Sequence, residues 1–377
     1  MNPIVEALFI GPTFIVALLV FANFNNVNVK ANRWFGFFIL SIFILQAEAL
    51  FYNERLPNPD QHIYDIIDLI RYIIAPVFYF SIVYYVEPNR KWKSGDNLHF
   101  LFGFLMLLLT ILSFFVPISE TKTPEEKELE TKAVLVVTII FCLQVLPYCI
   151  AAYYKISKYQ KNLLTYSSNT ERVNLSWLKK VVVCVIIITA LWLSDILFQL
   201  SEISTESDSI ITVLYFLSVW YIAYHSLNQK ELFIFSKEEK KEIEIIINEA
   251  EAKPETKKKL IQDEKLADYI QSLTNFMDTE KPHLDAEISL IRMAEQFKTS
   301  PHQLSYIINT GFEENFFQFV NRYRIEESKR MILDPAKNHL TLVGIAHEAG
   351  FNSKTVFNTT FKKITGKTPT EFKNEHK

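Results

Sequence analysis

The sequence predicts an all-α protein: a seven-helix transmembrane bundle followed by a cytoplasmic all-α domain with two helix-turn-helix units. Three observations carry this prediction. Residues 1–227 contain seven long apolar runs, and a helix of about 20 apolar residues can cross a bilayer. Residues 228–377 are charged and rich in helix-forming residues. Two patterns of short helix, tight turn and second helix lie between residue 283 and the C-terminus.

Composition limits the class of protein further. The 377 residues allow two or three domains, and the net charge of −3 gives no overall indication of a nucleic-acid partner. All three cysteines lie inside apolar runs, so they do not form a disulfide framework. The N-terminus has no basic segment and no small-residue cleavage site, which argues against a cleaved signal peptide. We divide the chain into residues 1–227, 228–282 and 283–377.

The seven apolar runs are joined by short polar loops whose basic residues predict the orientation. Loops one, three and five carry 11 Lys and Arg residues, and the alternate loops carry 4. Basic residues concentrate on the cytoplasmic side, so we expect the N-terminus outside and residues 228–377 in the cytoplasm. The predicted spans are 3–24, 33–52, 62–86, 98–118, 133–154, 179–200 and 209–227.

Ionisable and polar residues within the spans gather in the predicted outer half. Asp68 and Arg71 share one helix face, and Arg71 is expected to pair with Asp68, Asp195 or Glu48. One interpretation is a pocket, open to the outside, for a small polar ligand of unknown identity. The other is hydrogen bonding that holds the helices together. The pocket would be lined by Glu48, Asp68, Arg71, Asp195 and Gln199.

Residues 228–282 form a charged linker with one apolar stripe. Leu266, Ile270, Leu273 and Met277 recur at the spacing of a coiled-coil seam, although over fewer than two heptads. Two roles fit this stripe. Residues 260–280 could form a homodimer, or their helix could pack on the domain that follows.

The last domain contains the two helix-turn-helix patterns, joined by a longer helix over about 316–333. In the first pattern, Ser300 caps a helix that begins with Pro301. In the second, Gly350 ends one short helix and Ser353 caps the next, whose inward side carries Phe357, Phe361 and Ile364. The outward sides are polar, which is typical of DNA-binding helices. These outward residues are His302, Gln303, Ser305, Tyr306, Asn309, Lys354, Thr355, Asn358, Thr359, Lys362 and Lys363.

Residues 283–374 resemble the DNA-binding domain of the AraC/XylS family. The segment GFNSKTVFNTTFKKITGKTPTEFK is similar to the family signature, and NFFQFVNRYRIEESKRMIL is similar to its connecting helix. Together with an N-terminal apolar bundle, the chain resembles the membrane-bound members of that family in bacteria. For the bundle itself, the resemblance lies in the arrangement alone.

The resemblance implies that each unit inserts one helix into successive major grooves of double-stranded DNA. It places His302, Ser305 and Tyr306 at base-facing positions of the first unit, with Asn309 on the same outward side. In the second unit it places Lys354, Thr355 and Thr359 toward bases, and Asn358 and Lys362 toward phosphates. Thr359 stands where many relatives carry arginine, which can contact guanine through two hydrogen bonds.

The sequence therefore predicts a membrane-anchored transcription regulator that transmits a signal from outside or within the membrane. The resemblance implies the cytoplasmic membrane of a bacterium as its location. The alternative is a transporter-like membrane receptor whose cytoplasmic domain acts by sequestration or protein interaction. Neither a phosphate-binding Gly loop nor a metal-ligand cluster nor a Ser/His/Asp arrangement occurs, so we predict no enzymatic activity, no cofactor and no metal.

Overall fold

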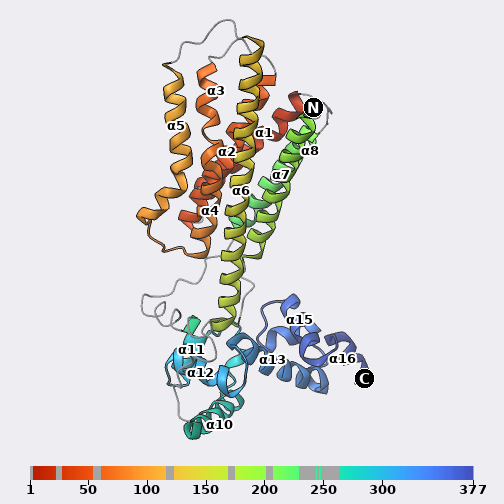
Figure 1. The fold of residues 1–377 in the computed structure, drawn as a ribbon. Helices are drawn as coiled ribbons and strands as arrows, with labels where there is room; N and C mark the ends of the chain where they lie inside the picture. The colour runs from red at the N-terminus through yellow and green to blue at the C-terminus, as the bar shows by residue number, and fades with distance from the viewer. Residues whose placement is uncertain are drawn as a thin grey trace. The chain divides into compact units, whose positions relative to one another are not determined.

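The computed structural model describes residues 3–22, 28–53, 61–115, 123–168, 175–200, 207–228, 243, 246–247 and 263–376. Within these ranges the chain is helical, without a β-strand. It divides into two compact units. Unit 1 comprises Met1–Ser157 and Leu175–Glu231, and unit 2 comprises Lys158–Asn174 and Leu232–Lys377. The helix labels below are those of Figure 1.

Unit 1 has helix in each of the seven predicted spans. The long apolar runs give uninterrupted helices, except that the third run forms α3 and α4 and the fourth forms the short 3-10 helix η1 followed by α5. The elements are α1 (Pro3–Ala22), α2 (Val29–Asn53), α3 (Gln61–Asp68), α4 (Arg71–Val86), η1 (Ser94–Phe100), α5 (Leu101–Ser113), α6 (Pro124–Tyr166), α7 (Ser176–Leu200) and α8 (Ser207–Asn228).

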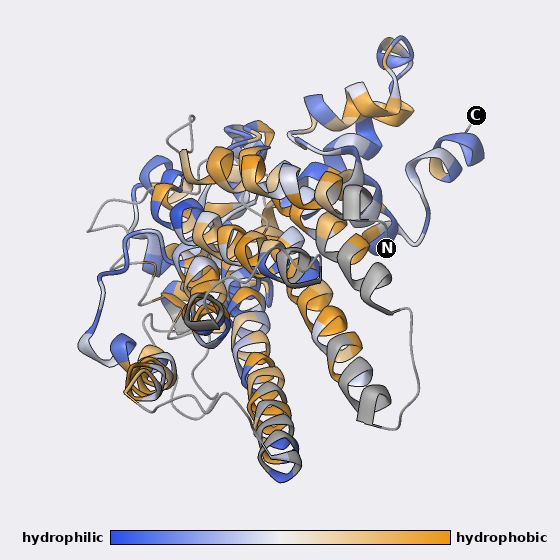
Figure 2. Cartoon of the chain, turned by 90° about the horizontal axis from the view of Figure 1, so that it is seen from above, coloured by the Kyte–Doolittle hydropathy of each residue, from blue (hydrophilic) through white to orange (hydrophobic). Residues whose placement is uncertain are grey.

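The core of unit 1 lies where α2 and α4 pack together, flanked by α1 and α8. Phe35 and Phe78 are buried there with ring centroids 6.3 Å apart. A side chain on Gly36 would meet Phe21 at 2.9 Å, so this glycine permits the close approach of α1 and α2. Figure 2 shows hydrophobic residues predominating along these long helices, whereas helices near the C-terminus mix both kinds.

Three helical stretches among the described residues are long and apolar enough to cross a membrane: Asp65–Val86, Ser94–Ser113 and Leu135–Tyr166. A shorter apolar stretch covers Ile10–Ala22. The predicted ranges are thus all helical, but the length and composition needed to span a bilayer are met by three rather than seven. The count of seven spans stays a prediction.

Unit 2 is built from shorter amphipathic helices, each ended by a cap or turn. Its elements, besides the end of α6, are α10 (Asp263–Thr279), η3 (Pro282–Leu284), α11 (Leu290–Gln296), α12 (Pro301–Gly311), α13 (Phe316–Leu333), η4 (Pro335–Lys337), α14 (Leu342–Glu348), α15 (Lys354–Thr365) and α16 (Pro369–Glu375).

Helix α10 carries the apolar stripe for which two roles were predicted. It packs against α12, and Leu273 and Met277 are fully buried. Ile270 lies so close to α12 that a side chain on Gly311 would meet it at 2.6 Å. Three of the four stripe residues, Ile270, Leu273 and Met277, therefore pack on the following domain. Residues 260–262 lie outside the described residues, and a homodimer through 260–280 gains no support from these contacts.

Candidate nucleic-acid interface

The first helix-turn-helix unit consists of α11 and α12. Ser289 caps α11 by accepting a hydrogen bond from Arg292 N at 3.3 Å, and Ser300 caps α12 by accepting one from Gln303 N at 3.1 Å. Between them, Lys298 adopts a left-handed conformation with φ 57°. Thr299 N then donates to Ala294 O at 2.9 Å, which closes the end of α11. The turn is therefore held by backbone hydrogen bonds.

The second unit, α14 and α15, repeats this construction. Thr341 caps α14 and Ser353 caps α15 through their side-chain oxygens. Gly350 takes the left-handed position with φ 93°, and Phe351 N donates to Ala346 O at 2.9 Å. The predicted turn at Gly350 and the predicted cap at Ser353 are confirmed, whereas the cap at Thr341 was not predicted. The core beneath them, shared with α13, contains Ile325, Ile332, Ile345, Ala346, Ala349, Phe351, Phe357 and Phe361.

Helix α13 joins the two helix-turn-helix units and begins and ends as the sequence predicts. Asn315 and Gln318 form a reciprocal capping box at its start, and Asp334 follows its last residue. The helix packs against α12 on one side of the domain and against α14 and α15 on the other. It therefore fixes the separation of α12 and α15, the helices that resemble DNA-recognition helices.

One buried arginine of α13, Arg324, holds the two helix-turn-helix units together. Its Nε donates to His283 O at 2.7 Å and its Nη2 to Asp285 O at 2.9 Å. The guanidinium also lies over the ring of Phe351, 5.7 Å from the centroid. Burial lowers the pKa of Arg324 to about 10, so the side chain keeps its charge at neutral pH. Backbone carbonyls from the first half of the domain and a ring from the second thus share one cation.

The predicted base-facing residues of the first helix-turn-helix unit are not equally accessible. His302 and Tyr306 are half-buried and Asn309 is exposed. Ser305 is only 6% exposed, so the prediction that it points outward is wrong. It lies one turn from Pro301 and Ile308, both buried, and thus on the flank of the packed face. Asn309 Nδ2 donates to Ser305 O at 2.9 Å and to Ser305 Oγ at 3.1 Å.

In the second helix-turn-helix unit, all five predicted contact residues are exposed along one side of α15: Lys354, Thr355, Asn358, Thr359 and Lys362. Thr359 donates its hydroxyl proton to Thr355 O within the same helix. Because that hydrogen bond uses the only hydroxyl proton, Thr359 presents a methyl group and an acceptor rather than a free donor. Ile364, predicted to face inward, is 42% exposed, so that prediction is wrong.

The charges of α15 differ from those elsewhere in unit 2. Many basic residues of the domain are paired with carboxylates, as in Arg322–Glu314 at 2.9 Å and Lys337–Glu348 at 2.6 Å. Within the described part of the chain, Lys354, Lys362 and Lys363 form no ion pair. Unpaired lysines on an exposed helix attract phosphate groups. This side of α15 therefore has both the exposure and the charge that a DNA backbone requires.

Comparison with known proteins agrees with this geometry. Residues 293–375 match the model of a helix-turn-helix domain family of the AraC type. The matched segment begins within α11 and ends with α16, so it covers the last four residues of α11 and every helix from α12 to α16. The match supports a DNA-binding transcription regulator, a class whose domain is not catalytic. Neither a curated protein nor a solved structure gives a significant match.

In unit 1, the structure brings together three of the five predicted pocket residues. Arg71 Nη2 donates to Glu48 Oε2 at 3.0 Å, and Arg71 Nε lies 2.6 Å from Asp68 Oδ1. Glu48 is 10% exposed and Asp68 44% exposed, so the cluster reaches from the interior toward the surface. The side chains of Asp195 and Gln199 lie outside the described residues.

Sequence reasoning missed a buried polar triad in unit 1. Tyr85 donates to Asn32, Ser226 Oγ donates to Asn32 Oδ1 at 2.8 Å, and the Tyr85 and Ser226 hydroxyls lie 3.0 Å apart. These residues come from α2, α4 and α8, and each is at most 3% exposed. Their sequence separations are 53, 141 and 194 residues, so no local pattern could have revealed the triad.

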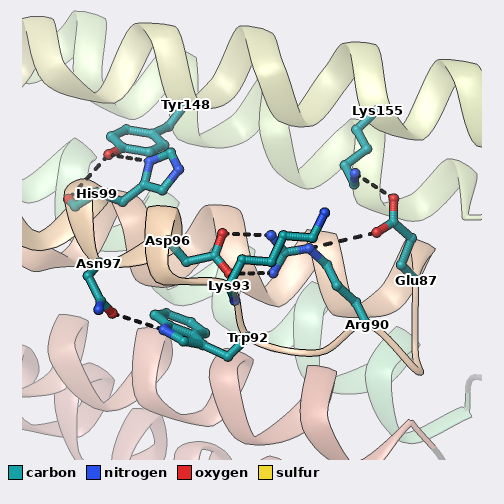
Figure 3. Close-up of polar contacts among 9 residues, drawn as sticks. All are labelled: Glu87, Arg90, Trp92, Lys93, Asp96, Asn97, His99, Tyr148 and Lys155. Atoms are coloured by element: carbon teal, nitrogen blue, oxygen red, sulfur yellow. Dashed lines mark hydrogen bonds and ion pairs between the residues drawn. The ribbon is translucent and has the colours of Figure 1, made fainter.

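A second missed network orders the loop between α4 and α5 (Figure 3). Arg90 binds both carboxylate oxygens of Asp96, at 2.7 and 2.6 Å, and the backbone N of Lys93 donates to the same carboxylate at 2.8 Å. Lys155 of α6 pairs with Glu87 at 2.7 Å. The charged loop is therefore a folded connection tied to α6, where the sequence had indicated only a basic turn.

Proposed function

We propose that the protein is a membrane-anchored, sequence-specific DNA-binding transcription regulator that responds to a signal received by its N-terminal part. The observation that carries the DNA-binding part is the exposed side of α15, with its unpaired lysines beside threonine and asparagine side chains. Phosphate contacts position a protein on DNA and base contacts provide specificity. Both kinds of group occur on this one side, within the segment that matches the helix-turn-helix family.

Membrane anchoring is supported by the exposed apolar side chains of α5. Leu101 is 58% exposed, Leu105 50% and Leu112 60%. Water would solvate such a helix poorly, whereas lipid chains would cover it at no cost. With the charge bias of the predicted loops, this supports a multi-pass protein of the bacterial cytoplasmic membrane, with its N-terminus outside and its DNA-binding domain in the cytoplasm.

The signal is proposed to be a small polar ligand bound near Arg71. Arg71 lies between two carboxylates, so a ligand that displaces Asp68 could take its place with little change in charge balance. The substitution Arg71→Ala should change signal-dependent transcription and leave the DNA affinity of the purified chain unaltered. An unchanged transcriptional response would refute this pocket.

The DNA-binding function can be tested with the full chain in lipid nanodiscs. The protein is mixed with random-sequence duplexes, bound duplexes are enriched, and the affinity for the selected sequence is measured between about 50 and 200 mM salt. We expect Lys362→Ala to weaken binding to all duplexes and to reduce the salt dependence by about one phosphate contact.

The matched control is Lys329→Ala. Lys329 lies on α13 and pairs with Glu326 at 2.9 Å, so its removal should leave DNA binding unchanged. If no sequence is enriched at moderate salt, the proposal of sequence-specific binding fails. If Lys362→Ala and Lys329→Ala behave alike, α15 is not the DNA-contacting helix.

A further inference from the structure

A short segment from the region between the fifth and sixth predicted spans is built into the DNA-binding unit. Helix α6 ends at Tyr166, and residues 158–174 belong to unit 2 although residues 175–262, which contain predicted membrane helix and linker, separate them from α10 in sequence. Among its described residues, 158–168, four are buried, namely Leu163, Tyr166, Ser167 and Ser168, and none of these is more than 7% exposed. Two adjacent serines are unusual among such deeply buried residues.

Both serines bind to the start of the first helix-turn-helix unit. Ser167 forms an antiparallel bridge with Ser289, the residue that caps α11. Ser168 Oγ donates a hydrogen bond to Ile288 O at 2.7 Å. The segment thus pairs with the strand-like approach to α11, and its backbone and side-chain polar groups find partners there.

Ser168 also binds the residue that joins the two helix-turn-helix units. Its Oγ accepts a hydrogen bond from Arg324 Nη2 at 3.2 Å. The same guanidinium contacts His283 O and Asp285 O, and it lies against Gly350 and Phe351 of the second unit. Ser168 is therefore one of the groups that determine where Arg324 sits, and Arg324 determines how the halves fit together.

The docked segment does not cover the side of α15 that is proposed to contact DNA. Lys354, Thr355 and Thr359 are all exposed while Ser168 is in place. A blocking role would require the segment to shield these residues. The contacts instead support a role in holding the two units at a fixed relative orientation, which two successive major grooves demand.

We propose that residues 163–168 are an intramolecular docking element through which the chain between the fifth and sixth predicted spans holds the two helix-turn-helix units in the orientation that binds DNA. The link to DNA rests on the proposed function, whereas the docking itself does not. A change in α6 would reach DNA through the pair Ser168 and Arg324, independently of the linker 228–282.

Docking is tested first by disulfide formation in the full chain. Antiparallel bridge partners have Cα atoms about 4.5–5.5 Å apart, within the range that a disulfide spans. The variant Ser167→Cys/Ser289→Cys should form this disulfide on mild oxidation, detected by mass spectrometry of the linked tryptic peptides. The control Ser167→Cys/Ser300→Cys uses the cap of α12 instead and should not. Equal yields from the two pairs would refute the docking.

The role of Ser168 is tested by three substitutions. Ser168→Ala removes both hydrogen bonds and should shift the docking equilibrium about tenfold toward release. Ser168→Arg places a second guanidinium beside Arg324 and should abolish the engineered disulfide between positions 167 and 289 in the double-cysteine variant. Ser168→Thr keeps the hydroxyl and should behave as the unsubstituted chain. A disulfide that still forms with Ser168→Arg would show that this contact does not hold the segment.

The effect of docking on DNA binding is measured as the affinity of the full chain, held in nanodiscs, for the enriched duplex. Ser168→Ala should weaken binding about threefold to tenfold with the salt dependence unchanged, because no phosphate contact is lost. Unchanged affinity in Ser168→Ala and Ser168→Arg would overturn the coupling. If the disulfide forms but the unsubstituted chain enriches no duplex, the proposed function fails and the docking stands, so the two failures are distinguishable.

Discussion

The substitution Gly350→Ala should destabilise unit 2 more than any other single-methyl addition at a glycine of this unit. Two costs combine at this position. An alanine at φ 93° pays about 1–2 kcal/mol for the left-handed backbone. Its Cβ would also lie 2.4 Å from His283 O and 2.9 Å from Arg324 Nε, so backbone and a buried side chain would have to move. Such overpacking costs a further 1–3 kcal/mol, approximately.

Gly366→Ala is the matched control. Gly366 ends α15 with φ 79°, but nothing lies within 4 Å of the position that its Cβ would occupy. Gly366→Ala should therefore be destabilised by the backbone conformation alone, by about 1–2 kcal/mol. The difference between the two variants, about 1–3 kcal/mol, measures the crowding at Arg324.

The assay is hydrogen exchange of the full chain in nanodiscs, read by mass spectrometry over the amides of α13 and α14. These amides lie beneath the turn and exchange through opening of the unit, so their protection reports its free energy of unfolding. A loss of protection in Gly350→Ala no larger than in Gly366→Ala would refute the argument that Gly350 is required by close packing as well as by conformation.

Three further outcomes follow from the contacts. Burial lowers the pKa of His283 to about 4 from about 6.5 when unfolded, so the unfolded chain binds more protons between these values. Unit 2 should therefore lose about 2 kcal/mol of stability from pH 7.5 to pH 5, and His283→Phe should remove this dependence in the same exchange assay. Thr359→Arg should add a preference for guanine of about 1–3 kcal/mol in duplex selection, whereas Thr370→Arg on α16 should raise affinity without changing the preferred sequence. Tyr85→Phe should lower the free energy of unfolding of unit 1 by only about 1 kcal/mol, because Asn32 and Ser226 keep their mutual hydrogen bond. No change would show that the tyrosine hydroxyl contributes nothing.

The sequence predicted the local structure of unit 2 well because its signals act over a few residues. Ser300 and Ser353 cap the helices assigned to them, and Gly350 makes the expected turn. Helical periodicity also predicted that Phe357 and Phe361 would be buried. It failed for Ser305 and Ile364, which lie at the edges of their helix faces, where a rotation of a few degrees decides exposure.

The contacts that organise the domain were not predictable in the same way. Arg324 lies 41 residues from His283 and 156 from Ser168 in sequence. Helix α13 carries three arginines, Arg322, Arg324 and Arg330, and nothing in the neighbours of Arg324 in sequence marks it as the one that meets buried carbonyl groups. The pairing of Arg71 with Asp68 was predictable because Asp68 precedes it by one helical turn. Glu48 was one of three expected partners, and the sequence could not single it out because this bond depends on how α2 meets the third apolar run.

The two helix-turn-helix units share a construction but differ in the charge of the helix that is proposed to contact DNA. Helix α12 contains no lysine or arginine, whereas α15 carries Lys354, Lys362 and Lys363. Of these two helices, only α15 can attract phosphate through lysine side chains, and that attraction is independent of sequence. If α12 contacts the next groove as proposed, it does so without a lysine or arginine of its own to guide it, so its position must be set in advance. The buried contacts of Arg324 set that position. A small change in the angle between the two helix-turn-helix units should remove the contribution of α12 to DNA affinity and leave the contribution of α15 intact.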